Sequence, residues 1–307
     1  MFRLVLAGAL AASVLSSTLP ALAAPQPPLP PIAQTYEAGS VRVDRFGNGK
    51  DAVVFIPGLT CGPWEFAREI ALLQKDRTVY ALTLPGFDGR AAASGQLFQT
   101  ASADIWKFLD AQHVARPVLI GHSLGGTMAL LMATQHPERL RGVIAIDGLP
   151  VFPGAEDKTP AQRTAAGEQM RAMMGNAATP AAFEFVEKSY VLPYLVTDPA
   201  DAAAMAKLVA KSDPKASGDW MAQDYAQDLR PALAGANVPV LEIAPYDPGV
   251  DSKSFASAAA KQAYYAGLLA KAPHAKVEMV SGSRHFVMYD KPAELDADLT
   301  AQLHTLP

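Results

Sequence analysis

Apolar residues along this chain occur in short runs that alternate with longer amphipathic segments. The short runs predict strands at residues 41–43, 52–56, 78–84, 117–120, 142–146, 238–244 and 276–280. Several of these runs lack the polar and apolar alternation of a half-exposed sheet. We therefore expect mostly parallel strands that are covered on both faces.

The segments between these runs have the apolar spacing of helices. They predict helices at residues 63–74, 101–112, 124–136, 254–270 and 292–303. Strands that alternate with helices are typical of an α/β domain with helices on both faces of its sheet. The expected fold is a doubly wound, mostly parallel α/β sheet, with a core formed by residues 41–148 and 233–307.

Residues 149–232 interrupt this alternation, because they contain short helical patterns and no convincing strand. We interpret them as a helical cap inserted into the core. Five of the ten methionines lie here: Met170, Met173, Met174, Met205 and Met221. The i, i+3, i+4 spacing of the first three favours a hydrophobic core for the cap itself. The alternative is a surface that adapts to an apolar ligand, since thioether side chains repack easily.

The first 23 residues have the pattern of a secretory signal peptide. Arg3 precedes an apolar stretch, and Ala21-Leu22-Ala23 forms a small-residue cleavage site. The apolar stretch is too short to span the ~30 Å hydrocarbon layer of a membrane. We expect cleavage after Ala23, export to the periplasm or the medium, and no stable membrane anchor afterwards. Residues 24–40 are expected to form a Pro-rich lead-in.

Composition and charge exclude several classes of protein. The chain is 50% hydrophobic and 18% charged, which is typical of a globular protein and not of a disordered one. Its net charge is −4 and no basic run is present, so no nucleic-acid partner is expected. Cys61 is the one cysteine of the chain, so no internal disulfide can form.

One motif carries chemistry. Gly121-His122-Ser123-Leu124-Gly125 lies between a predicted strand and a predicted helix, which is the context of a nucleophile elbow. Such a sharp turn exposes the serine hydroxyl, and glycines flank it because side chains would crowd the turn. The Leu124 N–H lies at the N-terminus of the predicted helix, where backbone donors favour negative charge. A serine attacks only with a neighbouring base, so a histidine is required as well.

With this motif the chain resembles the α/β-hydrolase superfamily from about Val41 onward. The resemblance implies that Ser123 is the nucleophile and that the base follows the last strand. His285 has that position, in the segment Gly282-Ser283-Arg284-His285. It is therefore the expected catalytic histidine.

The resemblance also implies an oxyanion hole made of two backbone N–H groups. Leu124 supplies one, and Leu59 is the expected second donor, with Thr60 as the alternative. These two residues follow the strand at residues 52–56, where the family has a His-Gly loop. Pro57 stands where histidine is common, which does not affect a main-chain donor.

The acid that orients the histidine has more than one candidate. Asp247, after the strand at residues 238–244, matches the position of the family's acid after the cap. Asp147 is the alternative acid, because some family members carry it one strand earlier. Asp251 is a third candidate on the same loop as Asp247. Glu242 lies within a strand and receives no role.

The function that the resemblance implies is an exported serine hydrolase, of carboxylesterase or lipase-like type. It would cleave carboxylic esters through a Ser-His-Asp triad and an acyl-enzyme. The expected substrate is a small-molecule ester with an apolar portion, and no metal or organic cofactor is needed. Two alternatives remain: an acyltransferase with the same triad, and a non-catalytic ligand-binding protein of this fold.

Overall fold

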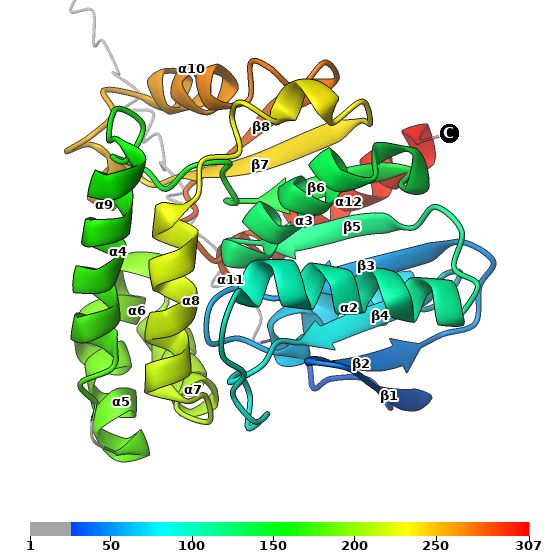
Figure 1. Ribbon diagram of the computed structural model, residues 1–307, viewed down its shortest axis with the longest axis horizontal. Coiled ribbons are helices and arrows are strands. Elements are labelled where there is room, and N and C mark those ends of the chain that lie inside the picture. Colours follow the sequence, from blue (N-terminus) through cyan, green and yellow to red (C-terminus); the bar gives the residue numbers. More distant parts are fainter. Residues whose placement is uncertain (1–25, 178, 307) are drawn as a thin grey trace, which may run out of the picture.

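The computed structural model describes residues 26–177 and 179–306 (Figure 1). The expected signal peptide, residues 1–23, lies outside these described residues, so its cleavage stays a prediction. Within the described ranges, no helix combines the length and the apolar character needed to cross a membrane.

An eight-stranded sheet forms the centre of the molecule. Its strands are β1 (Gln34–Ala38), β2 (Val41–Phe46), β3 (Ala52–Ile56), β4 (Thr78–Thr83), β5 (Val118–His122), β6 (Gly142–Ile146), β7 (Val240–Tyr246) and β8 (Ala275–Ser281). Their order is β1-β2-β4-β3-β5-β6-β7-β8. All pairs among β3 to β8 are parallel, and only β1 and β2 join antiparallel. The predicted mostly parallel sheet is confirmed.

The seven predicted strands are all present, and β1 is an additional strand. It was missed because it lies at the edge of the sheet and is largely exposed, so its sequence has no apolar run. In contrast, every residue of β5 and of β6 is buried. Burial on both faces explains why these strands lack an alternating pattern.

Helices cover both faces of the sheet (Figure 1). Their bounds are α1 (Ala67–Leu73), α2 (Leu97–Ala111), α3 (Leu124–Gln135), α9 (Pro248–Asp251), α10 (Ala258–Leu268), α11 (Val287–Asp290) and α12 (Pro292–Thr305). Apolar side chains of α2 and α3 share one buried cluster with the sheet. Those of α1 and α12 belong to a second cluster. The sheet therefore has a separate hydrophobic core on each side.

The segment between β6 and β7 forms a helical layer at one end of the sheet (Figure 1). It contains α4 (Pro160–Met174), α5 (Pro180–Val186), a π-helical turn (Glu187–Val191), α6 (Leu192–Leu195), α7 (Pro199–Val209) and α8 (Pro214–Ala226). The prolines that punctuate this segment begin its helices, since their missing N–H would be unpaired there anyway. Thr or Asp caps each of these helices, with its side chain accepting from a backbone N–H.

Helix α8 attaches this layer to the core. Trp220 is fully buried, and its Nε1 donates to the Pro85 carbonyl oxygen at 3.0 Å. Its ring packs against Phe87 and Phe98, with ring centroids 5.9 and 5.1 Å apart. The helical layer thus shares a hydrophobic cluster with the sheet, which fixes its position above the strand ends.

Candidate active site

Ser123 lies on the sharp turn between β5 and α3. Its backbone has φ 52° and ψ −123°, in the left-handed region that non-glycine residues rarely adopt. A Cβ on Gly121 would lie 2.1 Å from the Gly125 carbonyl oxygen, and a Cβ on Gly125 would lie 2.1 Å from that of Ile56. The two glycines are therefore required by the turn, as the motif predicted.

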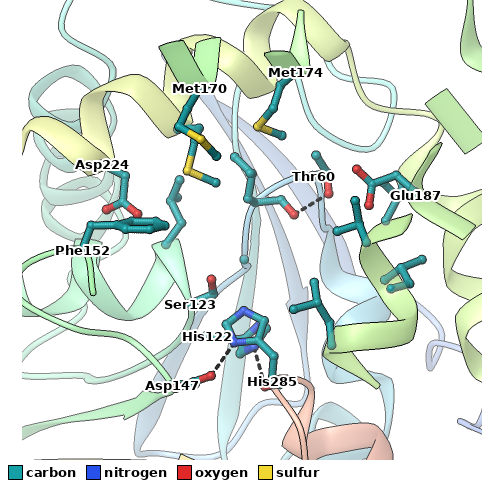
Figure 2. A pocket seen from close by; sticks show the side chains of 18 of the residues that line it. Thr60, His122, Ser123, Asp147, Phe152, Met170, Met174, Glu187, Asp224 and His285 are labelled. Atoms are coloured by element: carbon teal, nitrogen blue, oxygen red, sulfur yellow. Dashed lines mark hydrogen bonds and ion pairs between the residues drawn. The ribbon is translucent and has the colours of Figure 1, made fainter. Parts of the chain in front are cut away.

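His285 and Asp147 meet at the same pocket as Ser123 (Figure 2). His285 follows β8, and its Nδ1 lies 2.5 Å from Oδ2 of Asp147, which follows β6. The bond at Nδ1 leaves Nε2 of the imidazole as the nitrogen that can accept a proton. The Ser123 hydroxyl makes no hydrogen bond to another described residue and lines the pocket.

The structure corrects the expected orienting acid. Asp247 does not contact His285. Its Oδ2 instead accepts from Arg284 Nε at 2.7 Å, and its Oδ1 accepts from the Gly249 N–H at 2.9 Å. The alternative acid, Asp147, occupies the position beside His285. The reason is the strand order: β6 lies directly beside β5, so the residue after it is closer to the elbow than the residue after β7.

Charges and hydrogen bonds around Asp147 keep it ionised. Burial would raise the pKa of Asp147, but His285, Lys261 and the Tyr265 hydroxyl together lower that pKa to about 2. Tyr265 donates to Oδ1 of Asp147 at 2.5 Å. The pKa of His285 is lowered by its burial and by His122, against the opposing effect of Asp147. An ionised carboxylate beside a neutral imidazole is the state that a general base requires.

Two other acids near Asp147 are bonded to parts of the protein other than His285. Glu242 is fully buried in β7, and its Oε1 accepts from the Gly148 N–H at 3.2 Å. Burial and the charge of Asp147 hold the pKa of Glu242 well above its usual range. Asp251, the third candidate acid, pairs instead with Lys261 at 2.9 Å. Glu242 therefore supports the backbone just after Asp147, a role that the sequence did not reveal.

A buried pair beneath the elbow connects three loops. His122 Nδ1 contacts Glu65 Oε1, and both side chains are completely buried. Glu65 Oε2 accepts from the Gly58 N–H at 3.0 Å, while His122 Nε2 donates to the His285 carbonyl oxygen at 3.0 Å. Burial lowers the pKa of His122, but Glu65 more than offsets this and the pKa is raised. The pair thus joins the loop after β3, the elbow, and the histidine loop.

The two expected oxyanion donors line the pocket. Leu124 is the first residue of α3, and Leu59 lies in the loop after β3. Neither backbone N–H donates to another described residue, whereas the Gly58 N–H is occupied by Glu65. Thr60, the alternative donor, has φ 65°, and its hydroxyl contacts the Leu59 carbonyl oxygen. The assignment of these donors stays a prediction.

A cavity of about 830 Å³ lies between the core and the helical layer, above Ser123. Most of its wall is apolar. Four of the five methionines in the inserted segment line it: Met170, Met173, Met174 and Met221. Met205 is fully buried in an apolar cluster and does not line the cavity. The expectation of a separate cap core is therefore wrong for Met170, Met173 and Met174, whereas Met205 is buried in a cluster that the inserted segment shares with the sheet.

Neither a reactive thiol nor a metal site accompanies these residues in the part of the chain that the structure describes. Cys61 is buried, and burial together with the nearby Glu65 raises the pKa of its thiol well above the usual range. A thiol of that kind is inert. Among the described residues, no three His, Cys, Asp or Glu side chains are grouped so that they could hold a metal ion.

The geometry agrees with a comparison to known protein families. A model described as the alpha/beta hydrolase fold matches residues 51–292. The chain therefore belongs to the α/β-hydrolase family.

Curated relatives in this family have different activities. The chain is 28% identical to pimeloyl-[acyl-carrier protein] methyl ester esterase of Yersinia enterocolitica, over 81% of this chain and 92% of that protein. It is 31% identical to 2-succinyl-6-hydroxy-2,4-cyclohexadiene-1-carboxylate synthase of Escherichia coli O1:K1. That second match spans 36% of this chain and only 44% of the synthase.

Solved structures show the same fold at low sequence identity. An esterase from Thermogutta terrifontis superposes with a TM-score of 0.69 and 16% identity, over 89% of this chain and 98% of that one. An enol-lactonase from Burkholderia xenovorans LB400 superposes with a TM-score of 0.67 and 18% identity, over 88% and 100%. At these identities the solved structures show the fold alone.

Replacing each candidate acid separately by asparagine tests which of the two orients His285. We expect Asp147→Asn to lower kcat by about 10⁴-fold, because the imidazole loses the carboxylate that fixes its tautomer. Asp247→Asn removes only a partly exposed ion pair with Arg284, worth at most about 1 kcal/mol, so the loss is about fivefold or less. Both are measured as hydrolysis of 4-nitrophenyl butyrate. A larger loss of kcat in Asp247→Asn than in Asp147→Asn would show that Asp247 is the acid that orients His285.

Two buried glutamates one helical turn apart give opposite predictions for stability. Glu65→Leu leaves His122 and the Gly58 N–H without a partner, so the free energy of unfolding falls by about 3–5 kcal/mol. Glu69 is buried as well, but its two carboxyl oxygens have no hydrogen-bond partner among the described residues, and burial raises its pKa to about 8. Glu69→Leu is therefore neutral or stabilising. Urea unfolding measures both, and equal destabilisation would contradict the role given to Glu65.

Proposed function

We propose that this protein is a serine hydrolase that cleaves carboxylic esters of small molecules. The observation that carries the proposal is the 2.5 Å hydrogen bond between His285 Nδ1 and Asp147, in the pocket that holds the elbow serine. An orienting acid, a neutral imidazole and an exposed hydroxyl are the three parts that acyl transfer to serine requires. The proposal includes export, as the signal peptide pattern predicts.

The first half of the reaction forms an acyl-enzyme. His285 Nε2 takes the proton of the Ser123 hydroxyl as the oxygen attacks the ester carbonyl carbon. The carbonyl oxygen becomes negatively charged, and the Leu59 and Leu124 N–H groups stabilise it. When this intermediate collapses, the bond to the alcohol oxygen breaks and the His285 imidazolium donates its proton to the departing alcohol. Asp147 stabilises the imidazolium throughout without accepting the proton itself.

The second half releases the acid. A water molecule gives a proton to His285 and its oxygen attacks the acyl carbon on Ser123. The resulting intermediate collapses as the imidazolium returns the proton to the serine oxygen, so the enzyme regains its starting state. The apolar wall of the cavity suits the acyl or alcohol portion of the ester. A relative of similar length that acts on a methyl ester supports ester cleavage as the reaction.

Removing the proposed nucleophile is the direct test. We expect Ser123→Ala to lower kcat for 4-nitrophenyl butyrate by about 10⁶-fold, which leaves only the residual rate that substrate binding and the oxyanion hole supply. A fluorophosphonate probe is expected to label the folded wild type at Ser123 and to leave the variant unlabelled. Ser252→Ala, at an exposed position after α9, is the control and keeps full activity and labelling. Equal rates for wild type and Ser123→Ala would overturn the proposal.

The pH profile tests His285 as the base. Because only the neutral imidazole accepts a proton, kcat/KM rises with pH through the pKa of His285. This pKa lies below the ordinary value of 6.5, so the acidic limb has its midpoint below 6.5. Asp147 opposes this lowering, so Asp147→Asn moves the midpoint of its residual activity further down. A midpoint above 6.5 in the wild type, or an upward movement in the variant, would contradict this assignment.

A further inference from the structure

Two acidic side chains face the mostly apolar cavity from opposite walls (Figure 2). Glu187 lies on the π-helical turn of the inserted segment, and Asp224 lies near the end of α8. Neither takes part in the proposed acyl transfer. Glu187 is only 7% exposed, and its carboxyl group forms no hydrogen bond or ion pair with a described residue.

No positive charge in the wall neutralises these two acids. The described residues that line the cavity include no lysine and no arginine. The neighbours are apolar, with Phe152 and Met170 near Asp224 (Figure 2). Burial raises the pKa of Glu187 to about 7, and it does the same for Asp224 against an opposing effect of Thr127. Glu187 therefore loses a favourable interaction with water and gains no protein partner among the described residues, whereas Asp224 keeps the Thr127 side chain as its partner.

A carboxyl group of this kind contributes nothing to holding the helical layer in place. A buried acid without a partner destabilises a fold relative to an apolar side chain of the same size. The contrast with Glu65 is direct, because that buried acid has both of its oxygens satisfied by neighbouring residues. The position of Glu187, aimed into a large cavity above Ser123, gives it a partner only when the cavity is filled.

We propose that the cavity binds esters whose apolar body carries a positively charged ammonium group, which the negative charges of Glu187 and Asp224 attract. This inference deepens the proposed function and rests on it. A cation that enters stabilises the ionised form of both acids. The methionine-rich wall accepts the rest of the molecule, since thioether side chains adapt to apolar groups of different shape.

An anionic substrate meets the opposite conditions. Its charge would face Glu187, Asp224 and the ionised Asp147, with no lysine or arginine among the described lining residues to offset them. The same charges also act on the product. Ester hydrolysis releases a carboxylate next to Ser123, and repulsion by the acidic wall favours its departure from the cavity.

Three esters that carry a cationic, a neutral or an anionic group at the end of the same chain test the proposal. They are the 4-nitrophenyl esters of 6-(trimethylammonio)hexanoic acid, of 7,7-dimethyloctanoic acid, and of heptanedioic acid with its second carboxylate free. The first two have the same shape, because trimethylammonium and tert-butyl groups are isosteric. At pH 8, above the pKa of about 7 of both acids, we expect kcat/KM for the cation to exceed that for the neutral ester by at least about tenfold. The anion is expected to be the poorest substrate.

Substitutions of the two acids test whether they cause the preference for the cationic ester. Glu187→Gln and Asp224→Asn are each expected to lower the ratio of cationic to neutral kcat/KM at least about threefold, and the double variant brings it to about one. The ratio is internal to each preparation, so incomplete folding does not change it. Glu184→Gln is the matched control: it makes the same change three residues earlier and does not line the cavity. It keeps the wild-type ratio.

The possible failures are distinguishable. Two results contradict the cation site: a wild-type ratio of cationic to neutral kcat/KM of about one or less, and a tenfold preference that persists in the double variant. Neither result contradicts the proposed ester hydrolysis. If none of the three esters is hydrolysed, the proposed function fails. The site is then tested by calorimetric titration of Ser123→Ala with octyltrimethylammonium and with octanesulfonate. Binding of the cation alone, weakened at least about tenfold by adding Glu187→Gln, supports the site, and equal binding of the two ions rejects it.

Discussion

The hydrogen bond between the Asp147 carboxylate and the His285 imidazole is the interaction on which the site depends. It fixes which ring nitrogen remains free, and in the proposed mechanism that nitrogen takes the serine proton. The bond exists because the sheet order places the end of β6 beside the elbow after β5. Tyr265 and the charge of Lys261 keep Asp147 ionised, while burial keeps His285 neutral. A resting pair of this kind is ready to take a proton without any prior rearrangement of the protein.

Buried acids in this molecule divide into two groups according to whether they have partners. Glu65 and Glu242 are both completely buried, and each accepts a hydrogen bond from a backbone N–H next to a residue of the site. They hold loops in place. Glu187 and Asp224 face the cavity instead, and Glu187 has no partner at all among the described residues. The distinction matters because a satisfied buried acid stabilises a conformation, whereas an unsatisfied acid that faces a cavity gains a partner only when a ligand of opposite charge binds there.

Periodicity and local motifs predict the features of this fold that are local in sequence. The buried parallel strands and the elbow at Ser123 follow from short patterns, because each depends on residues close together in the chain. His285 was expected from the family resemblance, through its position after the last strand. The choice between Asp147 and Asp247 does not, since both follow a parallel strand and only the spatial order of the strands separates them. Tyr265 was missed for a related reason: it contacts Asp147 from α10, 118 residues away in the chain, and no motif marks it.

The most direct measurement is a crystal structure of the enzyme after reaction with a fluorophosphonate, whose tetrahedral phosphorus mimics the intermediate of ester cleavage. The expected adduct is on the Ser123 oxygen, with the phosphoryl oxygen about 2.7–3.1 Å from the N–H nitrogens of both Leu59 and Leu124. His285 Nε2 then lies within hydrogen-bond distance of the serine oxygen while its Nδ1 remains bonded to Asp147. An adduct on another residue, or one whose phosphoryl oxygen turns away from both N–H groups with His285 out of reach, would contradict the mechanism.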